Sequence, residues 1–363
     1  MRWFLAATSL VLAAPAAGQT PGPSRSPTSC LRCRIVVART VTLGAESGFN
    51  SLPTGVIAGV SDYLVVFGRA RNQMPILVSK EGGRGREFGR AGRGPGEHAG
   101  LVGGAVGPGD SIMVFDPGNS RLSIYSPDFR YVRSFAMPRA YSGVWLAGGT
   151  IVLNATLDTP QRFGQPFHVI SSQGEIIRSF GDDARDAIVR ATAPIDRRLL
   201  AVSGPDEFWA ADADRAYRVQ RWSAAGKKLA DFSRAPDWFP ARDGPRAPLS
   251  PESPPDPVMV AISSAGDRMI WVATLVPGAD WKKGLEPRRI TSAEQKPGYV
   301  VRDPSAVYDT RIQLLDAETG AVIAETRVDD AIAFALGGGL FGAVRLNDDD
   351  TSVVDLMKVA FQR

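Results

Sequence analysis

The chain has 363 residues, of which 44% are hydrophobic and 22% charged, and its formal net charge is +4. This balance is ordinary for a soluble globular protein. The small net charge argues against a nucleic-acid-binding or membrane-surface protein, which would carry a concentrated basic face. Its 38 glycines and 27 prolines suit a protein built from many turns.

The first eighteen residues have the pattern of a signal peptide. Arg2 precedes a short apolar run over residues 3–14, and small residues up to Gly18 follow it, with cleavage expected near Gln19. The run is too short to span a bilayer, no second long apolar stretch follows, and Gln19 stands where a lipoprotein would have Cys. We therefore expect a periplasmic or secreted protein with no stable membrane insertion.

The only two cysteines, Cys30 and Cys33, lie in an expected linker over residues 19–34. In an oxidising compartment a C-x-x-C of this kind favours a local disulfide. A zinc site would need a second pair of ligands, and haem attachment would need His where Arg34 stands. A redox motif would usually begin a helix, whereas the residues after Arg34 have the pattern of a strand.

One strand-and-turn unit recurs along the rest of the chain. Its clearest copy has strands at 111–115 (SIMVF), 121–125 (RLSIY) and 131–135 (YVRSF), separated by polar turns. Equivalent strands are expected at 63–67, 75–79 and 88; at 150–154, 167–171 and 176–180; at 207–211, 217–222 and 228–232; and at 269–274, 310–315 and 321–327.

The period of this unit indicates a β-propeller. The turns before the last strand, near Gly83, Asp128, Gly174 and Gly226, lie 45, 46 and 52 residues apart, which is the length of a four-stranded blade. The next such turn, Gly320, follows 94 residues later. We attribute the excess to two Pro-containing, non-periodic insertions at 235–256 and 277–305, which we interpret as loops.

The last unit begins at Ala331, has strands at 340–346 and 351–359, and then ends without an outer strand. Residues 35–43 (IVVARTVTL) alternate and have no partner nearby, so we expect them to complete that blade and remove the open sheet edges. The predicted fold is therefore all-β, a six-bladed β-propeller over residues 35–363 whose last blade is closed by an N-terminal strand.

The expected innermost strands are nearly all apolar or Gly: 55–60, 103–107, 144–147, 199–202, 258–262 and 331–336. Eight aromatic residues are expected to pack between blades rather than to stack on a ligand: Phe115, Tyr125, Phe135, Phe180, Trp209, Trp222, Phe232 and Trp271.

Two stretches resemble a known family. Residues 116–125 (DPGNSRLSIY), with Asp128 and Phe135, are similar to the NHL repeat, in which Asp, Asn and Arg flank the turn between two blade strands. Residues 88–98 (FGRAGRGPGEH) resemble an inter-blade loop of secreted bacterial six-bladed propellers, which often carries G-x-G-P-G-E-F. Here His98 replaces that Phe, and Phe129 stands where the family prefers Gly. The resemblance covers residues 88–135 and implies the fold rather than an activity.

Two sets of residues around these motifs are candidates for a role. Gly94, Pro95 and Gly96 are expected to shape the loop. Asp116 and Asn119 are expected to cap the turn by hydrogen bonds to nearby backbone, and Arg121 to reach back to Asp116. A ligand-binding alternative places five residues on one face near the channel mouth, where arginine would hold an anionic group: Arg86, Arg90, Arg93, Glu97 and His98.

No catalytic signature is present. The two histidines, His98 and His168, cannot form a three-His zinc site, no G-x-S-x-G elbow occurs, and residues 347–350 lack the ligand spacing of a calcium loop. We predict no metal and no cofactor.

The two insertions contain aromatic residues where no blade core requires them, in the segments 237–240 (DWFP) and 280–283 (DWKK). Long loops in compact folds are disproportionately functional. If both insertions lie on one face, they are expected to form a lid or a partner surface.

The leading functional hypothesis is a non-catalytic, monomeric, extracytoplasmic scaffold that binds a protein or a small polar ligand, and not nucleic acid. The alternative is a lactonase-like propeller hydrolase or lyase with a divalent metal in the channel. The apolar composition of the expected inner strands favours the scaffold.

Overall fold

The computed structural model describes residues 34–362, except 49–50, 69–72, 102, 138–139, 156, 158, 160–161, 163, 182–196, 243–245, 267, 291–294, 296, 348 and 350. The expected signal peptide, Cys30 and Cys33 lie outside the described residues. Within the described part of the chain, no helix has the length and hydrophobicity needed to cross a membrane.

The described chain forms six four-stranded antiparallel sheets. Blades 1 to 3 consist of β2 (Gly55–Ala58), β3 (Tyr63–Phe67), β4 (Ile76–Ser79) and β5 (Arg86–Glu87); β8 (Gly103–Val106), β9 (Ile112–Asp116), β10 (Arg121–Tyr125) and β11 (Tyr131–Ala136); and β12 (Ala140–Trp145), β13 (Ile151–Ala155), β14 (Phe167–Ile170) and β15 (Ile176–Phe180).

Blades 4 to 6 consist of β16 (Arg198–Gly204), β17 (Glu207–Asp212), β18 (Tyr217–Ser223) and β19 (Lys228–Arg234); β20 (Val258–Ser264), β21 (Met269–Pro277), β24 (Tyr308–Asp316) and β25 (Val322–Val328); and β26 (Ile332–Gly337), β27 (Leu340–Leu346), β28 (Ser352–Gln362) and β1 (Arg34–Leu43). The predicted strands are therefore found in all six blades.

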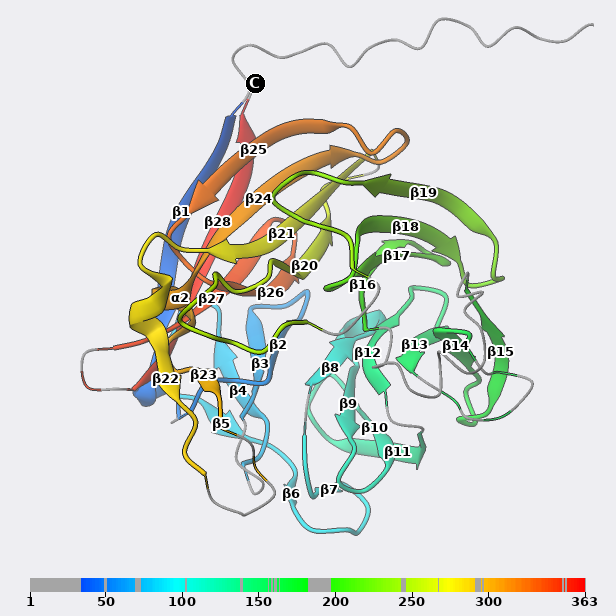
Figure 1. Ribbon diagram of the computed structural model, residues 1–363. Coiled ribbons are helices and arrows are strands. Elements are labelled where there is room, and N and C mark those ends of the chain that lie inside the picture. Colours follow the sequence, from blue (N-terminus) through cyan, green and yellow to red (C-terminus); the bar gives the residue numbers. More distant parts are fainter. Residues whose placement is uncertain are drawn as a thin grey trace, which may run out of the picture.

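The blades form a ring. The innermost strands contact one another in the cyclic order β2, β8, β12, β16, β20, β26 and back to β2, and they surround the middle of the molecule in Figure 1. In blade 6, β1 pairs antiparallel with β28 from Arg34 opposite Gln362 to Leu43 opposite Val354. The fold is thus the predicted six-bladed β-propeller, and the first and last described strands lie in one sheet.

The core is divided among the blade interfaces. Six apolar clusters occur in the described part of the ring, and each joins the middle strands of two neighbouring blades. All five residues of β9 and of β13 are buried, because a blade is covered on both faces by its neighbours. This explains why the second strands are continuous apolar runs, while the outer strand β11 is mostly half-exposed or exposed.

A glycine and an aromatic residue fit together across three interfaces. A Cβ atom added to Gly174, Gly226 or Gly320 would lie 2.4, 3.2 or 2.6 Å from Phe135, Phe180 or Phe232 of the preceding blade. All three glycines also have positive φ angles, of 89°, 85° and 70°. The repeated Gly turn and the aromatic at the end of the last strand are therefore parts of one packing contact, as expected for inter-blade aromatics.

The two ends of the ring differ in their connections. Because strands alternate in direction within each blade, the links between blades and the links between second and third strands all lie at one end, named here the loop face. The first-to-second and third-to-fourth links lie at the other end, the turn face, and are short, such as 205–206 and 224–227. The insertions 235–256 and 277–305 are both on the loop face.

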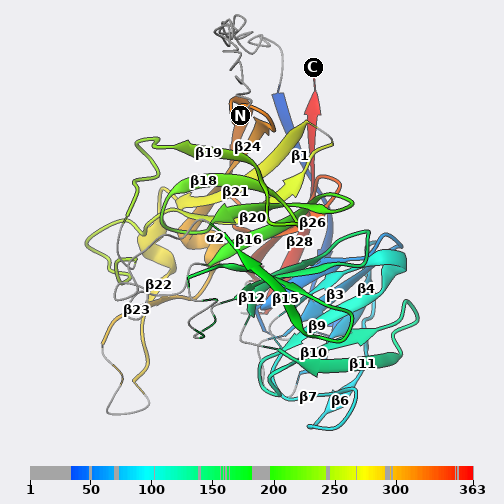
Figure 2. The ribbon, with the colours of Figure 1, turned by 90° about the vertical axis from the view of Figure 1, so that its right-hand side faces the viewer.

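The insertion 277–305 contains secondary structure that its sequence did not reveal. It holds η3 (Trp281–Gly284), β22 (Leu285–Pro287), β23 (Tyr299–Val301) and the start of α2 (Pro304–Val307). The hairpin β22–β23 projects away from the ring in Figure 2. Three-residue strands are too short to show a periodicity.

The aromatics of the insertions are needed for packing after all. Trp281 is buried with Val307, Tyr308 and Ala331, just before the inner strand of blade 6. Phe239 is 1% exposed and joins the cluster between blades 4 and 5. The expectation that no core requires them is therefore wrong, because each insertion folds back onto the ring.

Candidate functional site

A cavity with a volume of about 440 Å³ lies along the ring axis. It is lined by the inner strands, mostly through small or aliphatic side chains, among them Gly55, Gly104, Gly143, Ala261 and Ala335. This volume is within the range of small-molecule sites. The inner strands have the apolar and Gly composition predicted for them.

The cavity wall also offers backbone polar groups. Each inner strand pairs with a second strand on one edge only, so its other edge turns N–H and C=O groups toward the axis. Four hydroxyl side chains, of Thr54, Ser142, Ser263 and Ser264, lie among the described lining residues. A ligand could therefore be hydrogen-bonded around its circumference without a charged contact.

One charged side chain, that of Arg197, lines the cavity within the described part of the chain. Arg197 immediately precedes β16 and is exposed, and its carbonyl accepts a hydrogen bond from the N–H of Ala213 (3.2 Å). Because β16 starts at the loop face, this guanidinium lies at the loop-face mouth of the cavity. The sequence prediction missed Arg197, whose position could be found only by extending the inner strand of blade 4 by two residues.

The described residues contain no group of three or more His, Cys, Asp or Glu side chains able to hold a metal ion. Among the described lining residues of the cavity there is likewise no carboxylate and no histidine. The described lining side chains therefore do not offer the carboxylate and imidazole ligands that a channel-bound divalent metal would need.

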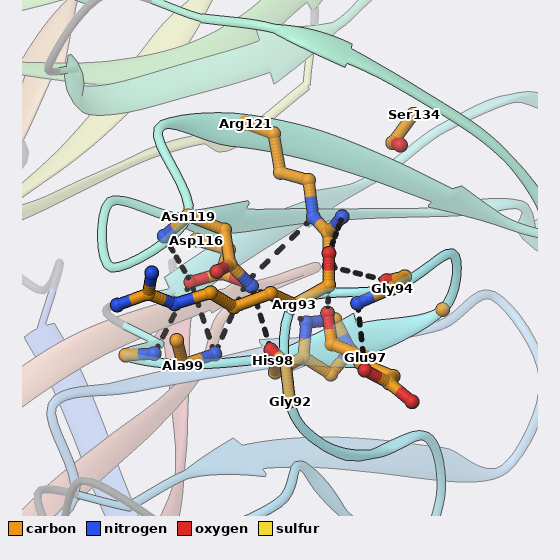
Figure 3. Close-up of polar contacts among 12 residues, drawn as sticks. Gly92, Arg93, Gly94, Glu97, His98, Ala99, Asp116, Asn119, Arg121 and Ser134 are labelled. Carbon is orange, nitrogen blue, oxygen red and sulfur yellow. Dashed lines mark hydrogen bonds and ion pairs between the residues drawn. The ribbon is translucent and has the colours of Figure 1, made fainter.

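The motif residues of blades 1 and 2 form a separate cluster, shown in Figure 3. At its centre is the Asp116 carboxylate, which is fully buried. It accepts hydrogen bonds from the N–H of Gly100 (3.1 Å), the N–H of Asn119 (3.2 Å) and Asn119 Nδ2 (2.8 Å). Burial opposes ionisation of Asp116, but contacts from His98, Asn119 and the Ala99 N–H outweigh it and hold its pKa below the usual value.

Arg121 also holds the glycine-rich loop, residues 88–98, in place. Its guanidinium donates to the carbonyls of Arg93 (3.1 Å), Gly94 (2.7 Å) and Glu97. Its Nε lies 3.9 Å from Asp116 Oδ2, so the main partners are loop carbonyls rather than the expected Asp116. Within the loop, Gly96 has a φ of 70°, and Pro95 is exposed.

His98 is part of the same buried cluster. It is 1% exposed, its Nε2 lies 2.7 Å from Tyr125 Oη, and its Nδ1 lies 3.5 Å from Asp116 Oδ2. Burial raises the pKa of Tyr125 to about 12, so this hydroxyl stays protonated and able to donate. A ligand cannot reach this imidazole while the loop is closed over it.

The other four candidate ligand residues lie on the loop surface. Arg86, Arg90 and Arg93 are exposed, and Arg90 Nε forms an ion pair with Glu97 Oε1 at 2.8 Å. A hydrogen bond from the Gly94 N–H and the nearby Arg90 charge lower the pKa of Glu97. None of the five candidates is among the residues that line the axial cavity.

Phe129 marks a departure from the resembled pattern that the structure explains. It has a φ of 64°, a conformation in which glycine is unstrained. Its ring packs at 5.1 Å from Tyr63 and 5.3 Å from Phe88, and Arg86 lies 5.9 Å above it. The cost of the backbone conformation, about 1 kcal/mol, is thus offset by aromatic packing.

Comparisons with known proteins show the fold alone. No family model matches the chain, and no curated protein matches its sequence. Among solved structures, a DUF4221 family member from Bacteroides vulgatus has a TM-score of 0.60 at 11% identity, covering 90% of this chain and 99% of that one.

A protein from Bacteroides fragilis, whose export is itself a prediction, has a TM-score of 0.57 at 14% identity, covering 94% of this chain and 98% of that one. Virginiamycin B lyase from Staphylococcus aureus is more distant, with a TM-score of 0.46 and 10% identity over 91% and 100% of the two chains. At that distance the likeness carries no argument about activity.

Proposed function

We propose that the protein is a non-catalytic, extracytoplasmic binding module that holds a small ligand in its axial cavity, entered from the loop face. The observation that carries this proposal is the cavity of about 440 Å³, which the described residues line with uncharged side chains and one arginine. A closed ring with a shaped and largely uncharged axis can bind, but it offers no described pair of groups for acid–base or nucleophilic chemistry.

The distribution of loops supports the loop face as the working end. Both long insertions lie there, and each is fixed to the ring: Arg242 N–H donates to the Arg215 carbonyl (2.8 Å), and Leu346 N–H donates to Asp303 Oδ1 (3.3 Å). Binding residues concentrate on loops held by a rigid scaffold. The turn face carries only short links.

The proposal includes export and a place in the NHL-repeat-like group. Export rests on the pattern of residues 1–18. The grouping rests on Asp116, Asn119 and Arg121, whose hydrogen bonds join one blade turn to the preceding inter-blade loop. We further propose that the module acts as a monomer, because the ring leaves each blade covered by its own neighbours.

Analysis of the mature protein, purified from the periplasm or medium of its native host, tests this proposal. Native mass spectrometry should detect a chain beginning near Gln19 that carries, at most, an organic ligand and not a metal. Elemental analysis that finds one bound divalent ion per chain would contradict the proposal and favour the lyase-like or lactonase-like alternative. A chain that keeps residues 1–18 in the cytosol would contradict export.

A further inference from the structure

We propose that the ligand of the axial cavity is an amphipathic monoanion, with a carboxylate-like group at Arg197 and an uncharged, mainly apolar body along the axis. This inference rests on the proposed function and names the class of ligand for it.

The charge pattern along the cavity gives the ligand its polarity. Arg197 stands at the loop-face mouth, and among the described lining residues every other side chain is uncharged. At the opposite mouth the lining consists of Val202, Ser264, Gly337 and Gly338. A molecule that fits this pattern carries its negative charge at one end only.

Arg197 is available for such a contact. Its side chain is exposed, and within the described residues no hydrogen bond or ion pair to its guanidinium occurs. Its backbone is held by the Ala213 N–H, so the base of the side chain is fixed. A guanidinium binds carboxylate or sulfonate oxygens in pairs and stays charged at all accessible pH values.

The rest of the cavity suits an apolar body. The side chains Val56, Leu199, Leu200, Val260 and Ala335 lie along its wall. Binding of such a body removes apolar surface from water, which favours the complex. The axis-facing backbone groups leave room for a few polar substituents on the ligand.

The arginines of the glycine-rich loop are less suited to this ligand. Arg90 is paired with Glu97 at 2.8 Å, Arg86 lies over the Phe129 ring, and none of the loop arginines borders the cavity. They could attract an anion from solution but offer its body no enclosed surface.

Titration calorimetry with three eight-carbon probes tests the inference: octanoate, octan-1-ol and octylammonium. Octanoate should bind with one site per chain, octan-1-ol about tenfold more weakly because it lacks the charge-assisted contact, and octylammonium more weakly still. Octanoate affinity should fall as salt concentration rises, since the guanidinium is exposed. It should also fall as the pH drops through the pKa of octanoic acid, because protonation removes the negative charge.

Two arginine variants locate the anionic contact. Arg197→Gln should weaken octanoate about tenfold, to the affinity of octan-1-ol, and leave octan-1-ol unchanged. Arg93→Gln, which removes an exposed charge on the same face away from the cavity, should leave both affinities unchanged. Equal loss in the two variants, or no binding of octanoate at all, overturns the inference.

Two variants that narrow the axial cavity test the binding site independently of the ligand class. Val202→Trp and Ser264→Phe each add volume at the turn-face end of the cavity, and two positions guard against misfolding of one variant. Both should weaken octanoate and octan-1-ol together. If both weaken them but octan-1-ol binds wild type as tightly as octanoate, the anionic ligand class is wrong while the axial binding site stands. If neither narrowing variant affects any probe that binds, the axial site is wrong as well.

Discussion

At the scale of single residues, a few buried polar groups define how one blade is fastened to the next. Asp116 and Arg121 receive and donate hydrogen bonds that hold the glycine-rich loop to the turn between β9 and β10. The residue types were recognisable as a motif, because each has a specific hydrogen-bonding role. Their partners were less predictable: Arg121 was expected to bind Asp116 but instead binds carbonyls of the loop.

Asp116→Asn should destabilise the fold by about 2 kcal/mol, because a buried carboxylate that accepts several N–H groups is replaced by an amide that can accept with one oxygen only. Chemical denaturation of the two proteins measures the difference. Asp128→Asn is the matched control, since its side chain is 58% exposed, and it should change stability by less than about 0.5 kcal/mol. Equal effects would contradict the assigned role.

The difference in stability between wild type and Asp116→Asn should depend on pH. The pKa of Asp116 is lowered in the folded protein, so its stabilising contribution is complete above the ordinary value of about 3.9 and is lost as pH falls through the folded value. The stability gap between wild type and Asp116→Asn should therefore be constant from about pH 7 to pH 5 and shrink below about pH 4. A gap that widens on acidification would contradict this sign.

Gly320→Ala should destabilise the protein more than Gly266→Ala. Both glycines have positive φ, at 70° and 93°, so both substitutions incur a backbone cost of about 1 kcal/mol. A Cβ at Gly320 would lie 2.6 Å from Phe232, whereas the one at Gly266 would meet nothing within 4 Å. Overpacking should add about 1–3 kcal/mol at Gly320 alone. Thermal and denaturant unfolding would reveal the difference, and equal losses would refute the packing contact.

At the scale of elements, the pairing of β1 with β28 depends on a buried carboxylate as well as on the backbone ladder. Asp355 on β28 is fully buried and accepts from Thr42 of β1 and from Arg345 Nε at 2.7 Å. Arg39 of β1 lies 3.5 Å away. These side chains select the register that joins strands more than 300 residues apart.

Asp355→Asn should therefore cost about 3 kcal/mol, because it leaves two arginines without their buried partner. Amides of β1 should exchange with solvent faster than those of β17 in the variant, as measured by hydrogen exchange. Asp330→Asn, which removes the half-buried partner of the exposed Arg39 at 2.7 Å, should cost less than about 1 kcal/mol. Uniform exchange across all blades in the Asp355 variant would argue against a local clamp.

The insertion 277–305 could be recognised from the sequence, but its packing on the ring could not. Its proline content and lack of period correctly indicated a departure from the blade repeat, but not the burial of Trp281, which is 8% exposed. A single aromatic in a polar segment has the same sequence signature whether it packs beneath the loop or projects from it. Only the tertiary contact with Val307 and Ala331 decides between them.

Trp281→Ala should lower stability by about 3 kcal/mol through loss of this satellite core. Lys282→Ala, which removes the neighbouring cation 5.5 Å from the Trp281 ring, should cost less than about 1 kcal/mol. Denaturant midpoints and m-values compare the two. A Trp281 variant as stable as wild type would mean that the insertion is independent of the ring.

At the scale of the whole molecule, the repeat period and the alternation of apolar residues were enough to predict six blades and the strands of each, because every blade must bury the same two faces. The sequence also indicated that the inner strands are mainly apolar or Gly, and these strands line the axial cavity. Arg197 did not, because its place at the mouth depends on where β16 begins, and strand ends are weakly encoded. Residues 88–98 were candidates for a ligand site because glycines and charged residues occur both in structural turns and in binding loops.

Hydrogen exchange with and without saturating octanoate decides whether ligands bind on the axis of the ring. Inner-strand amides that face the axis have no ladder partner, so a bound ligand should slow their exchange. We expect added protection in peptides covering 54–58, 197–204, 260–264 and 333–338, with no change in 86–98. Protection confined to 86–98, or to the projecting hairpin at 285–301, would contradict it.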